Sequence, residues 1–132
     1  MNVNYLCPHC RGAINALENI ILAARKKRKN TGLVLLHEDL GNYKSSFSAT
    51  LVVEPGDIVD FFCPLCHKSL NTRRGIHFAY YIRIDESGNE SKIVISRMYG
   101  EKATFKIEDG KAVESYGECA RKYIDPEWFI KE

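Results

Sequence analysis

The chain has 132 residues, of which 45% are hydrophobic and 11% are aromatic, and it carries a formal net charge of +2. This length predicts one domain, or one domain with a small appended module, and the composition argues against intrinsic disorder. The nearly balanced charge excludes a field over the whole molecule that would attract nucleic acid or membranes, so such a contact requires a local cluster of charges.

The first motif from the N-terminus is Cys7-Pro8-His9-Cys10. A Cys-x-x-Cys pair serves either thiol–disulfide exchange or a metal site, and the two functions must be distinguished. The residues before it form no secretory signal, and no apolar run reaches the roughly 18 residues that span a membrane. We therefore expect a cytoplasmic protein, in which close cysteine pairs are more often metal ligands or redox catalysts than disulfides.

Residues 13–29 fit two kinds of secondary structure. Their apolar residues follow a helical stripe, and their content of Ala, Leu, Glu and Lys favours a helix. However, the turn-forming sequence Asn30-Thr31-Gly32 and the apolar run after it predict a returning strand. We predict a hairpin in which residues 18–26 pair with residues 32–37.

Two further strands are predicted before the next cysteine pair. Residues 37–46 have the composition of a loop, with Gly41-Asn42 as a breaker. Residues 47–62 are predicted to form a strand, a turn at Pro55-Gly56 and a second strand that leads into Cys63. This arrangement brings a hairpin directly to the second cysteine pair.

The second pair, Cys63-Pro64-Leu65-Cys66, repeats the form of the first. Each pair is followed by an apolar residue four positions after its second cysteine. Two such turns can direct four sulfur atoms at a single zinc ion about 2.3 Å away. A tetrahedral site of four cysteines leaves no position for water or substrate, so we expect one structural zinc ion per chain. The predicted ligands are Cys7, Cys10, Cys63 and Cys66.

A redox site is the alternative for the first pair. A thioredoxin-type pair follows a buried strand inside a larger βαβ framework, and only six residues precede Cys7. The two pairs instead resemble those of zinc ribbons, in which two Cys-x-x-Cys turns on β-hairpins hold one ion, as in small ribbons of transcription, translation and nucleic-acid processing. Here 52 residues separate Cys10 from Cys63, more than in most ribbons. The added loop-closure entropy of about 1 kcal/mol is small beside the roughly 10 kcal/mol that structural zinc contributes.

The remainder of the chain predicts an antiparallel meander. Turn-forming residues separate segments in which apolar residues occupy alternate positions, as half-buried strands require. Asp125 and Pro126 predict a short helical turn near the C-terminus. The predicted fold class is therefore mainly β, a β-rich α+β fold, with zinc-ribbon hairpins in residues 1–74 and the meander packed on them in residues 75–132.

The densest cluster of charge lies at the predicted tip of the hairpin. Its five cations, with two more after the second cysteine pair, form a candidate phosphate-binding surface. These residues are Arg25, Lys26, Lys27, Arg28, Lys29, Arg73 and Arg74. Tyr5, Tyr43 or Phe47, if exposed, could add base stacking. The alternative is a solvated tip whose charges keep the protein soluble.

No enzyme motif accompanies these features, since the sequence has neither a Gly-rich phosphate loop nor a Gly-x-Ser-x-Gly elbow. The remaining candidates are interpreted as structural or surface residues: His9, His37, His67, His77, Cys119 and Trp128. We predict a non-enzymatic zinc-binding module that contacts nucleic acid or a protein complex bound to it, with no membrane or small-molecule partner evident. The alternatives are a zinc-stabilised protein–protein adaptor and a thiol oxidoreductase that uses Cys7 and Cys10.

Overall fold

The structure is a computed structural model that describes residues 3–26, 30–72 and 77–118. About 51% of this part of the chain is strand and none of it is helix, which confirms the mainly β fold class. It therefore contains no helix long and apolar enough to cross a membrane. The first five strands are β1 (Asn4–Leu6), β2 (Asn15–Ala16), β3 (Asn19–Lys26), β4 (Asn30–His37) and β5 (Ser45–Phe47). The next five are β6 (Asp60–Phe62), β7 (Phe78–Ile84), β8 (Glu90–Ser96), β9 (Thr104–Glu108) and β10 (Lys111–Tyr116).

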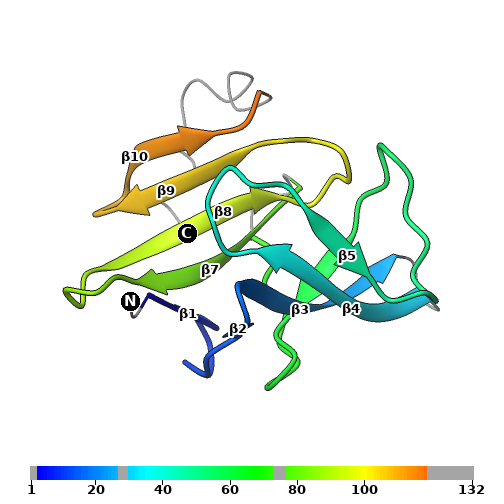
Figure 1. Ribbon diagram of the computed structural model, residues 1–132, viewed down its shortest axis with the longest axis horizontal. Coiled ribbons are helices and arrows are strands. Elements are labelled where there is room, and N and C mark those ends of the chain that lie inside the picture. Colours follow the sequence, from blue (N-terminus) through cyan, green and yellow to red (C-terminus); the bar gives the residue numbers. More distant parts are fainter. Residues whose placement is uncertain (1–2, 27–29, 73–76, 119–132) are drawn as a thin grey trace.

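The strands form two open antiparallel sheets, and Figure 1 shows β7 to β10 on one side of the molecule and β3 to β5 on the other. Sheet A has the order β1-β7-β8-β9-β10, which confirms the predicted meander and adds β1 to its edge. Sheet B has the order β2-β3-β4-β5, with β6 paired to β3. The N-terminal strand thus completes the sheet formed by the C-terminal half. The predicted boundary between residues 1–74 and 75–132 falls outside the described residues and stays a prediction.

The segment that fitted both helix and strand forms the predicted hairpin. β3 pairs with β4 along its whole length, and the buried residues of β3 recur at every second position. Leu17, which a helical stripe would bury, is 93% exposed. It lies in the two-residue turn between β2 and β3, where Leu17 and Glu18 have positive φ angles of 50° and 68°. A turn with two positive φ angles matches the twist of the strands that it joins.

The segment after β5 is a turn, so the prediction of a strand there was wrong. The Ser48 N–H still donates to the Leu33 carbonyl of β4 at 2.9 Å, but the Leu51 N–H donates locally to the Ser48 carbonyl at 2.9 Å. The Ser48 hydroxyl accepts a hydrogen bond from the Leu33 N–H at 2.7 Å, which fastens the turn to β4. This side-chain hydrogen bond offers the backbone an alternative to a continued strand ladder. The predicted turn at Pro55-Gly56 is confirmed.

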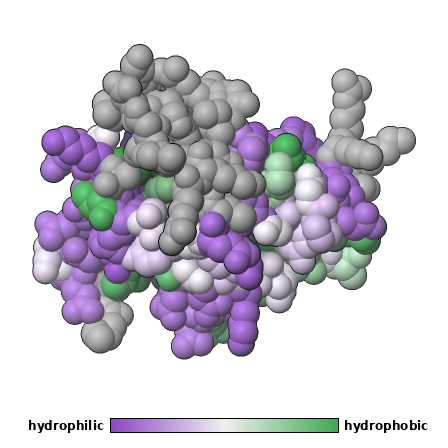
Figure 2. All heavy atoms as spheres, turned by 90° about the horizontal axis from the view of Figure 1, so that it is seen from above, coloured by the Kyte–Doolittle hydropathy of each residue, from purple (hydrophilic) through white to green (hydrophobic). Residues whose placement is uncertain are grey.

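The main hydrophobic core lies between the two sheets. Leu22 and Val34 of sheet B pack there with Tyr81 and Ile93 of sheet A, and each is at most 3% exposed. A second, smaller cluster that includes Phe105 belongs to the opposite face of sheet A. The described surface visible in Figure 2 is mainly hydrophilic, and its apolar residues appear in small separate groups. Burial between the sheets is thus the main apolar contribution to folding.

Arg97, directly after β8, connects the two sheets by hydrogen bonds. Its guanidinium donates to Asp60 Oδ1 at 2.9 Å, to the Val59 carbonyl at 3.3 Å and to the Phe78 carbonyl at 3.2 Å. Asp60 begins β6 in sheet B, whereas Phe78 begins β7 in sheet A. Burial lowers the pKa of Arg97 and the Asp60 carboxylate raises it, so the ion pair offsets the cost of burying the charge.

Substitution of Arg97→Gln should lower the free energy of unfolding by about 2 kcal/mol, because it removes charged hydrogen bonds and leaves their half-buried acceptors unpaired. Glu90→Gln is the matched control, since Glu90 pairs with Arg11 at 2.9 Å on the exposed surface. Its effect should be much smaller because solvent screens that pair. Urea denaturation of both metal-loaded variants measures the difference, and equal losses of stability would contradict the connecting function of Arg97.

The predicted helical turn at Asp125 and Pro126 lies outside the described residues, as do Cys119 and Trp128. They therefore stay predictions.

Candidate metal centre

The two Cys-Pro-x-Cys stretches fold into the same tight turn. In the first, the Arg11 N–H donates to the Cys7 carbonyl at 2.9 Å, and in the second, the His67 N–H donates to the Cys63 carbonyl at the same distance. Arg11 and His67 both adopt positive φ angles, 63° and 67°. A left-handed residue after the second cysteine reverses the chain, so that each turn returns alongside the strand that entered it.

Backbone amides point at the first sulfur of each turn. Cys7 Sγ accepts hydrogen bonds from the N–H groups two and three positions later, at 3.2 and 3.4 Å. Cys63 Sγ accepts the equivalent pair at 3.3 and 3.4 Å. Such hydrogen bonds stabilise a thiolate, which is the form of cysteine that binds metal.

The four sulfur atoms of the two turns converge on one point. Cys7 Sγ lies 3.7 Å from Cys66 Sγ, and Cys10 Sγ lies 3.8 Å from Cys63 Sγ. All four sulfurs lie within 4.8 Å of one another. A tetrahedron of sulfurs that are each about 2.3 Å from a central ion has edges of about 3.8 Å. The cluster could therefore hold one metal ion in tetrahedral geometry.

The four thiols lie in different environments. Cys7 and Cys63 are fully buried, Cys66 is half-buried and Cys10 is exposed. Burial raises the pKa of Cys7 to about 12, whereas a backbone hydrogen bond from Lys68 lowers the pKa of Cys66. The opposite directions follow from position, because Cys7 faces the core and Cys66 faces the surface. A bound cation favours the thiolate at all four positions and offsets the cost of burial at Cys7.

Two asparagines position the strands that lead into the turns. Asn15 Oδ1 accepts a hydrogen bond from the Tyr5 N–H of β1 at 3.1 Å, and Asn71 Oδ1 accepts one from the Phe61 N–H of β6 at 3.2 Å. Sequence reasoning missed both residues. The available signal was their spacing, since each stands five positions after the second cysteine of its pair.

The cluster joins the two sheets. The first turn extends β1, which belongs to sheet A, and the second extends β6, which belongs to sheet B. A direct contact also connects the turns, because His9 Nε2 lies 3.0 Å from the Ser69 carbonyl. His9 is thus a structural residue near the cluster. A metal ion bound here would hold both sheets at one point.

The structure describes two residues of the predicted phosphate-binding surface, and both are paired with carboxylates. Arg25 Nη2 lies 3.5 Å from Asp60 Oδ2, and its guanidinium lies 4.9 Å from the centre of the Phe62 ring. Lys26 Nζ lies 2.7 Å from Asp57 Oδ2. These acidic residues precede the second cysteine pair, and the pairing of β6 with β3 brings Asp60 opposite Arg25. The other predicted contacts lie outside the described residues: Lys27, Arg28, Lys29, Arg73 and Arg74.

The aromatic residues expected to assist this surface are not free for stacking on a base. Tyr5 is only 3% exposed, and its hydroxyl donates to the Glu38 carbonyl at 2.8 Å. Tyr43 and Phe47 are half-buried, and Phe47 packs edge-on against Tyr99. The condition of exposure is thus not met at Tyr5, because alternation along β1 turns this side chain into the core.

Comparisons of the chain with protein-family models, with curated proteins and with solved structures find no match. The chemistry of the site is therefore argued from its own geometry. Four cysteines that surround one point complete a tetrahedral coordination sphere, and a complete sphere has no open position for a substrate. Such a site stabilises a fold rather than catalysing a reaction.

Purified protein should contain about one metal ion per chain, and chelation should unfold it, because metal binding and folding share one free energy of roughly 10 kcal/mol in sites of this kind. Cys63→Ser should lose the metal and the cooperative thermal transition together. Cys119→Ser is the matched control and should retain both. Elemental analysis with thermal denaturation measures these outcomes, and a chelated protein with an unchanged transition would refute a structural metal.

Substitution of Asn71→Ala should weaken metal binding by roughly tenfold without changing its stoichiometry, because the residue orients the strand that carries Cys63. Asn15→Ala should act in the same way on the first turn. Asn89→Ala, in the exposed turn before β8, is the control and should bind metal as the parent does. Competition with a chromogenic chelator gives the three affinities, and three equal values would show that the asparagines have no positioning function.

Proposed function

We propose that this protein is a non-enzymatic binding module whose two sheets are held together by one structural zinc ion. The observation that carries the proposal is the convergence of four sulfurs at tetrahedral spacing, 3.7 and 3.8 Å across the two turns. Zinc forms closed tetrahedral sites of this composition and has no redox chemistry of its own. Its function here is to fix the position of β1 relative to β6.

Zinc is favoured over other metals by the ligand set. Four thiolates in a tetrahedron select zinc or iron, whereas magnesium and calcium prefer oxygen ligands. Elemental analysis of protein purified without added metal distinguishes the two candidates. Iron in place of zinc would refute this part of the proposal and leave the structural function of the site intact.

Nucleic acid, alone or within a protein complex, is the partner that we assign to the basic run. Support comes from the density of cations between β3 and β4, where phosphate contacts release counterions. Arg25 and Lys26 contribute less to the basic surface than the sequence suggests. Their charges are neutralised by Asp60 and Asp57. The contacts are therefore assigned to residues 27–29, with Arg73 and Arg74 as further candidates.

A protein–protein adaptor is the second candidate function, and a thiol oxidoreductase is the third. The adaptor is favoured by the neutralisation of Arg25 and Lys26, which reduces the basic surface. The redox function is disfavoured because its two cysteines would be occupied by the metal, and an insulin-reduction assay on zinc-loaded protein should stay at background. The absence of enzymatic activity and the cytoplasmic location stay predictions.

Reversal of charge at Lys27, Arg28 and Lys29 to Glu should weaken binding to generic single-stranded RNA and flatten its salt dependence. Each lost phosphate contact lowers the slope of log affinity against log salt by roughly 0.7. The control variant carries Glu at Lys44, Lys102 and Lys111, so the net charge changes by the same amount. Filter binding at several salt concentrations gives the slopes. If both triple variants bind alike, or the parent binds neither RNA nor DNA at low salt, the adaptor replaces the nucleic-acid module.

A further inference from the structure

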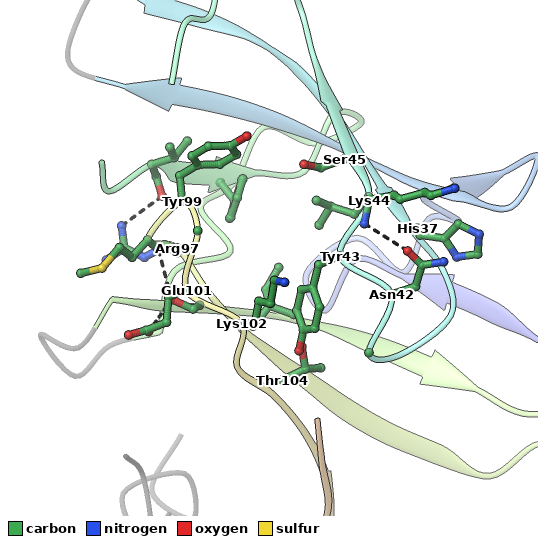
Figure 3. Close-up of a pocket in the computed structure, with 18 of the residues that line it drawn as sticks. His37, Asn42, Tyr43, Lys44, Ser45, Arg97, Tyr99, Glu101, Lys102 and Thr104 are labelled. Atoms are coloured by element: carbon green, nitrogen blue, oxygen red, sulfur yellow. Dashed lines mark hydrogen bonds between the residues drawn. The ribbon is translucent and has the colours of Figure 1, made fainter. Parts of the chain in front are cut away.

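A cavity of about 400 Å³ lies between the two sheets, apart from the cysteine cluster (Figure 3). Its walls come from β4 and β5 of sheet B, from β8 and β9 of sheet A, and from the connections 38–44 and 97–103. Cavities of roughly 300–1,000 Å³ are the usual size of small-molecule sites. None of the sequence motifs described above marks this cavity, because its walls come from segments far apart along the chain.

One end of the cavity is apolar and aromatic. Phe47 and Tyr99 contact each other there edge-on, with ring centres 5.6 Å apart. Phe61 and Ile95 also line the cavity. Aromatic walls favour a flat apolar ring over a bulky aliphatic group, since offset and edge-on contacts between rings add to the energy of burial.

Tyr81 brings a polar group to the cavity lining. This residue is 3% exposed and lines the cavity. Burial raises the pKa of Tyr81, as do the nearby Tyr5 and Tyr43 hydroxyls, so the group remains a hydrogen-bond donor at neutral pH. A phenolic hydroxyl on a cavity wall can donate a hydrogen bond to a bound acceptor.

A cation accompanies this donor. Lys102 lines the cavity and lies beside Tyr43 in Figure 3. It is exposed and forms no ion pair with a carboxylate of the described residues. The charged groups with other partners are Arg97, which binds Asp60, and Glu101, which faces His77 and accepts from Ser96. Asp39 lies at the rim with its side chain 75% exposed, 3.7 Å from His37. Lys102 and Lys44 are both exposed lining residues without an ion pair to a described carboxylate, and they favour an anionic ligand.

The walls are held in place without a ligand. The Tyr43 hydroxyl lies 2.8 Å from Thr104 Oγ1, which ties the connection 38–44 to β9. The ring contact between Phe47 and Tyr99 ties β5 to the connection after β8. Both ties bridge sheet A and sheet B across the cavity. A preformed site loses little conformational entropy when a ligand binds.

We propose that this cavity binds a small aromatic carboxylate. The carboxylate accepts a hydrogen bond from the Tyr81 hydroxyl and pairs with Lys102, while the ring lies against Phe47 and Tyr99. The proposal concerns a second site and is independent of the metal and of nucleic acid.

The test titrates zinc-loaded protein with 2-naphthoate and follows backbone amide signals by NMR. We expect a dissociation constant of about 0.1–1 mM, as ordinary ligand efficiency gives for a compound of this size. The shifted signals should belong to residues 38–47 and 95–104. The neutral analogue 2-naphthalenemethanol should bind several-fold more weakly. No binding at 5 mM, or shifts confined to other residues, would overturn the proposal, as would tighter binding of decanoate, which has no ring.

Variants separate the two polar contacts. Lys102→Ala should weaken the binding of 2-naphthoate by about threefold to fivefold, as expected for the loss of an exposed ion pair. It should leave the affinity for 2-naphthalenemethanol unchanged. Tyr81→Phe should weaken the binding of 2-naphthoate by about fivefold, because the hydrogen bond to the carboxylate is lost. The matched controls Lys111→Ala and Tyr80→Phe lie outside the cavity lining and should bind as the parent does. Equal affinities for 2-naphthoate in parent, Lys102→Ala and Tyr81→Phe, each with its zinc content intact, would refute the assigned contacts.

Discussion

The arrangement of this protein depends on one geometric requirement, which is that four sulfur atoms from two sheets meet at a single point. Cys7 and Cys10 extend a strand of sheet A, whereas Cys63 and Cys66 extend a strand of sheet B. The tetrahedral spacing of the sulfurs leaves little freedom in how these strands cross. Core packing, the Arg97 hydrogen bonds and the cavity between the sheets occur in the same relative arrangement of the two sheets.

Much of the fold could be predicted because period-two patterns and turn residues are local signals. The meander of β7 to β10 and the hairpin of β3 and β4 were both found in this way. The turn at Leu17-Glu18 could not be predicted from the sequence, because neither residue type favours the positive φ angles that both residues adopt. A tertiary contact holds that turn in place, as the Glu18 carbonyl accepts from the Glu38 N–H at 3.0 Å.

The sequence predicts the metal ligands of the candidate site but not the residues that surround them. Repeated spacing of cysteines is visible in a sequence, whereas the acids opposite Arg25 and Lys26 depend on which strands pair. The run of cations at residues 25–29 therefore suggests a larger basic surface than the described part of the fold presents. The cavity was invisible for the same reason, because Phe47, Tyr81 and Tyr99 become neighbours only when the two sheets pack.

The distance along the chain between the two cysteine pairs also affects how the protein is made. Cys66 follows Cys7 by 59 positions. At about 5–20 residues per second, a ribosome needs roughly 3–12 s to synthesise that interval. During this time the nascent chain offers only two of the four thiols, and β7, the partner of β1, has not yet emerged. Capture of a metal ion by all four cysteines would thus be a late event in biosynthesis, and until then the first thiol pair would be open to oxidation.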